Sequence, residues 1–180
     1  MKRGKTMIVL KSPDKYVRGE NDLMVFLAGG ITKCEDWQEE VIKELGRYNF
    51  NDNVIVMSPR REEFDITDKT AGRKQIEWEF KYLSDMDLFS MYFCNSESVQ
   101  PICMYELGRY ISDMSHRFPF SIKDRVIVGI EYGYSREQDV LIQTRLAFDY
   151  KDNDIVWNNT TAEEYAQHLA RKIRYLLNNR

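Results

Sequence analysis

The stretch MVFLA at residues 24–28, closed by Gly29 and Gly30, decides the fold that this sequence predicts. A continuous apolar run of this length is typical of a strand that is buried on both faces in the middle of a parallel sheet. A helix with one apolar face is expected to follow over about residues 35–48. This order, a buried strand and then a helix, recurs to the end of the chain.

The remaining elements complete an alternating pattern. Four more strands are expected at residues 54–57, 88–93, 126–130 and 154–157. Helices are expected at 75–86, 101–114 and 139–148, and a capping-box sequence at 161–164 starts a terminal helix. The alternation predicts a flavodoxin-like, doubly wound α/β fold with a five-stranded parallel sheet in the order 2-1-3-4-5.

Two details of this fold depend on weaker patterns. Residues 7–10 are a candidate for an extra edge strand, but the turn-rich stretch 12–22 isolates them from the other elements. In the helix expected at 75–86, a helical period places Ile76, Phe80 and Leu83 on the side that faces the core.

Length and charge limit the class of protein. With 180 residues, a single domain over 1–180 is expected, in which 1–23 form an N-terminal extension or an edge strand. The net charge of −3 predicts no binding to a nucleic acid polymer or to an anionic membrane. The sequence shows neither a signal peptide nor an apolar run of membrane length, so a cytoplasmic protein is expected.

The cysteines and histidines predict no metal site. Cys34, Cys94 and Cys103 are odd in number and form no CxxC pair, so neither a disulfide framework nor a zinc site is expected. Cys94 and Cys103 are interpreted as packed thiols. The two histidines, His116 and His168, form no ligand pattern such as HExxH. No metal and no other cofactor is therefore expected.

Two acidic side chains are expected at the crevice where the strand order reverses, between the strands that end at Ala28 and Phe93. Glu106 lies in the first turns of the helix that Pro101 opens, where the helix dipole favours an ionised carboxylate that can attack carbon. Glu79 lies early in the preceding helix and can point into the same crevice. Such a pair indicates a glycosyl transfer like that of retaining glycosidases. A pair of solvated helix acids is the more frequent explanation.

Glycines and arginines at the same edge of the sheet suit a ligand. Gly29 and Gly30 would let a ligand approach the backbone closely, although a plain tight turn explains them as well. Arg60 and Arg61 follow the second strand, where they suit a phosphate or a carboxylate. An ion pair with the acidic residues of segment 62–65 is an equal alternative.

Six motifs occur in the order found in the nucleoside 2-deoxyribosyltransferase family, which the chain resembles over about residues 24–160. They are VFLAGGI (25–31), DWQ (36–38), SPRR (58–61), IEWE (76–79), SDMDL (84–88) and QPICMYELG (100–108). The resemblance implies a flavodoxin-like fold and a homo-oligomer. It also implies that the protein transfers a deoxyribosyl group between the nucleobases of 2′-deoxynucleosides.

Carried over to this sequence, the resemblance makes Glu106 the nucleophile, which forms a covalent deoxyribosyl intermediate. Glu79 would be the acid that helps to protonate the base, at a position where the family often has Asp. The sugar would lie over Gly29 and Gly30.

Further residues enter the candidate site through the same resemblance. Ile31, Trp37 and Gln100 lie in its motifs and are candidate substrate-binding residues. Family members complete the site with residues of a neighbouring subunit, and Asn158 and Asn159, after the fifth strand, are candidates for that role.

Three other functions stay open. A relative of these transferases hydrolyses 2′-deoxynucleoside 5′-monophosphates, and Arg60 or Arg61 would suit the phosphate. A nucleotide-binding module would keep the fold without the chemistry. Cleavage of another N-riboside, such as a nicotinamide dinucleotide, would need room for a larger ligand. The expected partner is in each case a small nucleoside or nucleotide.

Overall fold

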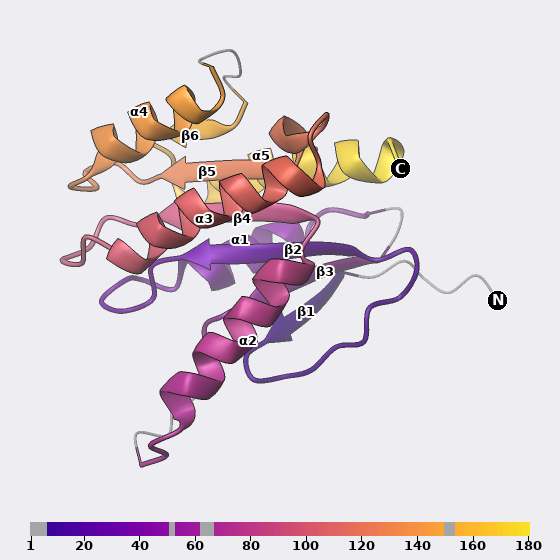
Figure 1. The fold of residues 1–180 in the computed structure, drawn as a ribbon, viewed down its shortest axis with the longest axis horizontal. Coiled ribbons are helices and arrows are strands. Elements are labelled where there is room, and N and C mark those ends of the chain that lie inside the picture. The colour runs from indigo at the N-terminus through magenta and orange to yellow at the C-terminus, as the bar shows by residue number, and fades with distance from the viewer. Residues whose placement is uncertain (1–6, 51–52, 62–66, 150–153) are drawn as a thin grey trace.

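The computed structural model describes residues 7–50, 53–61, 67–149 and 154–180. Its central feature is a six-stranded parallel sheet in the order β1-β3-β2-β4-β5-β6 (Figure 1). The strands are β1 (Met7–Lys11), β2 (Leu23–Gly29), β3 (Val54–Ser58), β4 (Leu88–Phe93), β5 (Val126–Ile130) and β6 (Val156–Asn158). The predicted flavodoxin-like order is confirmed, because β3-β2-β4-β5-β6 is the expected 2-1-3-4-5.

The expectation of five strands was wrong by one strand. β1 pairs with β3 in parallel, from Met7 beside Val54 to Lys11 beside Ser58, and forms an edge of the sheet. A connection between parallel strands usually contains a helix. Residues 12–22, which connect β1 to β2, form none. The strand–helix alternation therefore did not reveal β1.

Helices cover both faces of the sheet (Figure 1). α2 (Ala71–Asp85), α3 (Pro101–Arg117) and α4 (Glu137–Ala147) lie on one face, and α1 (Trp37–Leu45) and α5 (Ala162–Asn178) lie on the other. A short 3-10 helix, η1 (Ile122–Asp124), precedes β5. Within the described ranges, no helix combines the length and apolar character needed to cross a membrane.

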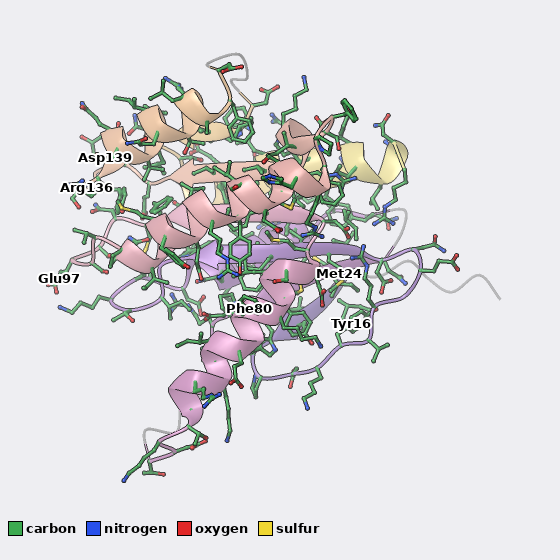
Figure 2. The ribbon with its side chains drawn as sticks, viewed as in Figure 1. Tyr16, Met24, Phe80, Glu97, Arg136 and Asp139 are labelled. Carbon is green, nitrogen blue, oxygen red and sulfur yellow. A yellow bond between two sulfur atoms is a disulfide. The ribbon has the colours of Figure 1, made fainter. Side chains whose placement is uncertain are left out.

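The buried face of α2 differs from the expected one. Ile76 and Phe80 are 67% and 51% exposed, whereas Trp78 and Tyr82 are buried together with Leu83. Phe80, labelled beside α2 in Figure 2, lies next to α3, where the guanidinium carbon of Arg109 is 4.8 Å from the centre of its ring. The placement of Ile76 and Phe80 in the core was therefore wrong.

The connection between β1 and β2 explains why Trp78 and Tyr82 are buried. The indole N–H of Trp78 donates to the backbone oxygen of Asp14 at 2.7 Å, and the hydroxyl of Tyr82 accepts from the backbone N–H of Tyr16 at 2.9 Å. Large aromatic side chains can be buried when their polar atoms find such partners. The sequence contains two stripes at helical spacing, and this connection decides which of them faces inward.

The cysteines contain a disulfide that the sequence did not predict. Cys34 and Cys94 are bonded, with their Cα atoms 6.4 Å apart, while Cys103 is free and buried. The expectation of no disulfide and the interpretation of Cys94 as a packed thiol were wrong. Cys34 follows β2 and Cys94 follows β4, and these neighbouring parallel strands bring the two residues together at the same edge of the sheet.

Candidate active site

A pocket opens at the carboxyl ends of β2 and β4, where the order of the sheet reverses. Its walls come from the loops after β2, β3 and β4 and from helices α2 and α3. The lining residues are Phe26, Ala28, Gly29, Gly30, Ile31, Thr32, Pro59, Glu79, Ser98, Gln100, Pro101, Ile102, Cys103 and Glu106. Six of the residues that the sequence indicated are thus brought together: Gly29, Gly30, Ile31, Glu79, Gln100 and Glu106.

The two acids reach this pocket from two helices on the same face of the sheet. Glu79 lies in the middle of α2, and Glu106 lies in the second turn of α3, after Pro101 at the start of the helix. Both side chains are half-buried. The arrangement places two carboxyl groups in a partly apolar pocket.

Burial of Glu106 and its proximity to Glu79 change how the two carboxyl groups ionise. Burial, followed by the charge of Glu79, raises the pKa of Glu106 to about 7, and the charge of Arg109 opposes this rise. Burial also raises the pKa of Glu79, against a hydrogen bond from Gln75 and the charge of Arg61. The pKa of Glu106 is thus raised, whereas the helix dipole was expected to favour its ionised form. Such a pair can supply one acid and one carboxylate near neutral pH.

The glycine turn is required by close packing. Gly29 has a φ of 153°, and a Cβ there would lie 2.3 Å from the backbone oxygen of Tyr92 and 2.5 Å from Cζ2 of Trp37. A Cβ on Gly30 would lie 2.6 Å from both Sγ of Cys34 and Oε1 of Gln100. Glycine at both positions therefore lets the turn pack closely against these groups, and both residues line the pocket.

Trp37 supports this turn and does not line the pocket. Its side chain is buried, and its indole N–H donates to the backbone oxygen of Gly30 at 2.9 Å. Its ring also packs 5.0 Å from that of Tyr92, centre to centre. Trp37 therefore stabilises the conformation of the glycine turn.

Gln100 lines the pocket from the start of α3. Its backbone is left-handed, with a φ of 50°, and its Nε2 donates to the backbone oxygen of Cys94 at 2.6 Å. Among the described residues, its buried Oε1 has no hydrogen-bond partner. A non-glycine residue in this conformation is uncommon and often marks a functional site.

Arg60 and Arg61 lie beside the pocket, and their guanidinium groups form ion pairs and hydrogen bonds with other groups of the protein. Arg60 forms an ion pair with Asp36 at 3.2 Å and donates to the backbone oxygen of Glu35 at 2.9 Å. Arg61 donates to Oε1 of Gln75. Both arginines line a neighbouring hollow that shares Ile31 with the pocket. The acidic partners expected in segment 62–65 lie outside the described residues.

Asn158 is not brought to this pocket. It ends β6, and its Nδ2 donates to Oε1 of Glu137, at the start of α4, at 2.8 Å. Within the part of the chain that the structure describes, no group of three or more His, Cys, Asp or Glu side chains is placed to hold a metal ion.

Sequence reasoning missed several residues at or near the pocket. Thr32 and Ser98, in the loops after β2 and β4, line it. Gln75, which hydrogen-bonds Glu79, precedes it by four positions on the same helix, and this spacing could have indicated the contact.

A comparison with family models identifies the family. The model described as "Nucleoside 2-deoxyribosyltransferase like" matches residues 22–118, more than half of the chain, and the chain belongs to this family. The match runs from the start of β2 to the end of α3 and includes both pocket acids. The family is one of nucleoside deoxyribosyltransferase-like enzymes, which implies a small nucleoside substrate. No curated protein matches this chain.

Proposed function

We propose that the protein cleaves the N-glycosidic bond of 2′-deoxynucleosides and transfers the deoxyribosyl group to a second nucleobase. The observation that carries this proposal is the convergence of Glu79 and Glu106 on one pocket that Gly29 and Gly30 also line. Membership of the family supports the same reaction class.

In the proposed reaction, a carboxylate oxygen of Glu106 attacks C1′ of the sugar. The bond between C1′ and the base nitrogen breaks, and its electron pair leaves with the base, which takes a proton from Glu79. The sugar stays attached to Glu106 as an ester. A second base then attacks C1′ with its nitrogen, returns a proton to Glu79 and releases Glu106 as a carboxylate.

The ionisation of the pair suits these roles. A protonated Glu79 weakens the repulsion that raises the pKa of Glu106, so Glu106 is more readily ionised while Glu79 holds the proton. Phe26, which is buried, supplies apolar lining beside the two acids.

The other functions are less well supported by the site. The pocket has a volume of about 200 Å³, below the range typical of sites for drug-sized ligands, which speaks against a dinucleotide. Arg60 and Arg61, the candidates for binding a 5′-phosphate, are bound by other side chains and by backbone oxygens. The two arginines therefore give no specific support to a monophosphate hydrolase.

The test is to incubate the protein with 2′-deoxynucleosides and their 5′-monophosphates, with and without a second free base. Chromatography then measures released and exchanged bases. Exchange that depends on the second base is expected. Release from monophosphates alone, without a second base, would instead identify a hydrolase, and tight binding without release would identify a binding module.

Variants test the two acids. Glu106→Gln is expected to abolish exchange, and Glu79→Gln to reduce it, while Glu77→Gln should keep the parent rate. Glu77 is a suitable control because it lies on the exposed side of the same helix, paired with Arg73 at 2.7 Å. Mass spectrometry of the denatured parent, quenched during turnover, should detect a deoxyribosyl ester that is absent from Glu106→Gln. Parent-like exchange by Glu106→Gln would show that the nucleophile is another residue.

A further inference from the structure

The side-chain amide of Gln75 connects the pocket to the edge of the sheet. Its Nε2 donates to Oε1 of Glu79 and to the backbone oxygen of Pro59, each at 2.7 Å. Its Oε1 accepts from the hydroxyl of Ser12 at 2.7 Å and from Nε of Arg61. A glutamine amide has two N–H donors and two acceptor lone pairs, so all four hydrogen-bonding positions are used.

These four contacts fix the orientation of the amide. If it were reversed, its oxygen would face the carboxylate of Glu79 and the carbonyl of Pro59, and its N–H groups would face Arg61. Each of these arrangements places like partial charges together. The N–H of Gln75 therefore points at Glu79.

The partners of Gln75 come from segments that are far apart in sequence. Gln75 and Glu79 are four residues apart on α2 and so share one face of the helix. Ser12 is buried and directly follows β1, whereas Pro59 and Arg61 follow β3. Because β1 pairs with β3, these segments arrive together beside α2.

We propose that Gln75 is a positioning residue for Glu79, and that Ser12 after β1 and Arg61 after β3 hold Gln75 for this purpose. The catalytic part of this inference rests on the proposed function, but the positioning itself can be tested without activity. Arg61 is thereby assigned to the support of the acid. β1 lies outside the stretch matched by the family model, and in this proposal it positions Ser12 beside Gln75.

The charges around Glu79 give the inference a measurable consequence. The titratable groups that interact with Glu79 are Arg61 after β3 and, on α3, Glu106 and Cys103. The N–H of Gln75 stabilises the ionised carboxylate, so its removal raises the pKa of Glu79 further. In such a variant Arg61 loses its bond to Gln75 and keeps its bonds to the hydroxyl of Ser12 and the backbone oxygen of Ala71.

The experiment replaces Gln75 by methionine, which keeps the length of the side chain and removes its hydrogen bonds. NMR titration of ¹³C-labelled glutamate side chains, with the Glu79 signal assigned by its loss in Glu79→Gln, measures the pKa directly. Gln75→Met is expected to raise it. In base release, kcat should fall about tenfold with little change in KM. The alkaline limb of the pH profile should move to higher pH, because Glu79 keeps its proton longer.

Gln143→Met is the matched control, because Gln143 is exposed on α4 and outside the pocket. It should leave both the Glu79 titration and the pH profile unchanged. A folded Gln75→Met protein with the parent pKa at Glu79 would overturn the proposal.

A milder variant covers the case in which Gln75→Met does not fold. Ser12→Ala removes one of the two donors to Oε1 of Gln75, and a smaller rise in the pKa of Glu79 is expected. An unchanged Glu79 titration in this variant would then overturn the proposal. If the parent releases no base from any substrate, the proposed function fails, while the NMR titrations still decide whether Gln75 positions Glu79.

Discussion

Glu106 is half-buried beside a second carboxyl group, and this position makes folding stability depend on pH. Its pKa is about 7 in the folded protein and near 4.5 in the unfolded chain, so the fold favours the protonated form. The resulting stabilisation is fully present below pH 4.5 and is lost as the pH rises through about 7. Burial of this carboxylate therefore destabilises the protein above neutral pH.

Replacement of Glu106 by glutamine removes this ionisation. Glu106→Gln is expected to raise the free energy of unfolding by about 2 kcal/mol at about pH 8, and to change it little at about pH 4.5. Urea unfolding at the two pH values measures the difference. Glu77→Gln, at an exposed ion pair, should show no comparable gain at the higher pH. A Glu106→Gln effect that is the same at both pH values would contradict the burial argument.

Two glycines should respond to alanine in opposite ways. Gly29→Ala is expected to destabilise the protein by about 2 kcal/mol or more, because its Cβ would meet the Tyr92 backbone and the Trp37 ring. Gly108→Ala is expected to stabilise it by about 0.5–1 kcal/mol, because a Cβ there meets nothing within 4 Å and alanine favours a helix. Urea unfolding of the two variants measures both effects. A stable Gly29→Ala protein would show that the turn can relax around a side chain.

Among the elements, α5 is held at its start by a complete capping box. The hydroxyl of Thr161 accepts from the backbone N–H of Glu164 at 3.2 Å, and the carboxylate of Glu164 accepts from the N–H of Thr161 at 3.0 Å. Thr161→Ala is expected to lower the free energy of unfolding by about 1 kcal/mol. Thermal or urea unfolding measures this loss.

Thr70 provides the matched comparison for this cap. It occupies the same position before α2 and is exposed, but it makes no capping hydrogen bond there, and its hydroxyl donates to Asp68. Thr70→Ala should therefore cost less than Thr161→Ala. Equal losses would mean that the capping box contributes no more than an exposed threonine does.

Whether a helix or strand could be predicted from the sequence depended on what buries it. β2 and β4 were predictable because strands buried on both faces need continuous apolar runs. The buried face of α2 was not predictable, since Ile76 with Phe80 and Trp78 with Tyr82 have the same helical spacing. The partners of Trp78 and Tyr82 lie in a loop distant in sequence. The same loop follows β1 and supplies Ser12.

At the scale of the whole molecule, the topology made the core of the candidate site predictable. Adjacent parallel strands end at the same edge, so the strand order alone places the loops after β2 and β4 together. This argument brought Glu79, Glu106 and the glycine turn to one pocket, as the structure has them. It did not reveal that Ser12 holds Gln75 beside Glu79, because that contact depends on an edge strand that the pattern left isolated.

The same topology could have indicated the Cys34–Cys94 disulfide, which constrains the chain over a sequence separation of 60. Closing a loop of that size is expected to contribute on the order of 4 kcal/mol to stability, by limiting the freedom of the unfolded chain. Reduction should therefore lower the urea midpoint, as measured by urea unfolding with and without a thiol reductant.

Variants of the three cysteines attribute this change to one bond. A protein with both Cys34→Ser and Cys94→Ser should match the reduced parent and ignore the reductant. Cys103→Ser, which removes the free thiol, should keep the parent's sensitivity. Labelling of the unfolded parent should detect one free thiol before reduction and three afterwards. If thiol labelling confirms reduction and the midpoint does not move, the cross-link does not stabilise the fold, and packing alone holds the loops after β2 and β4 together.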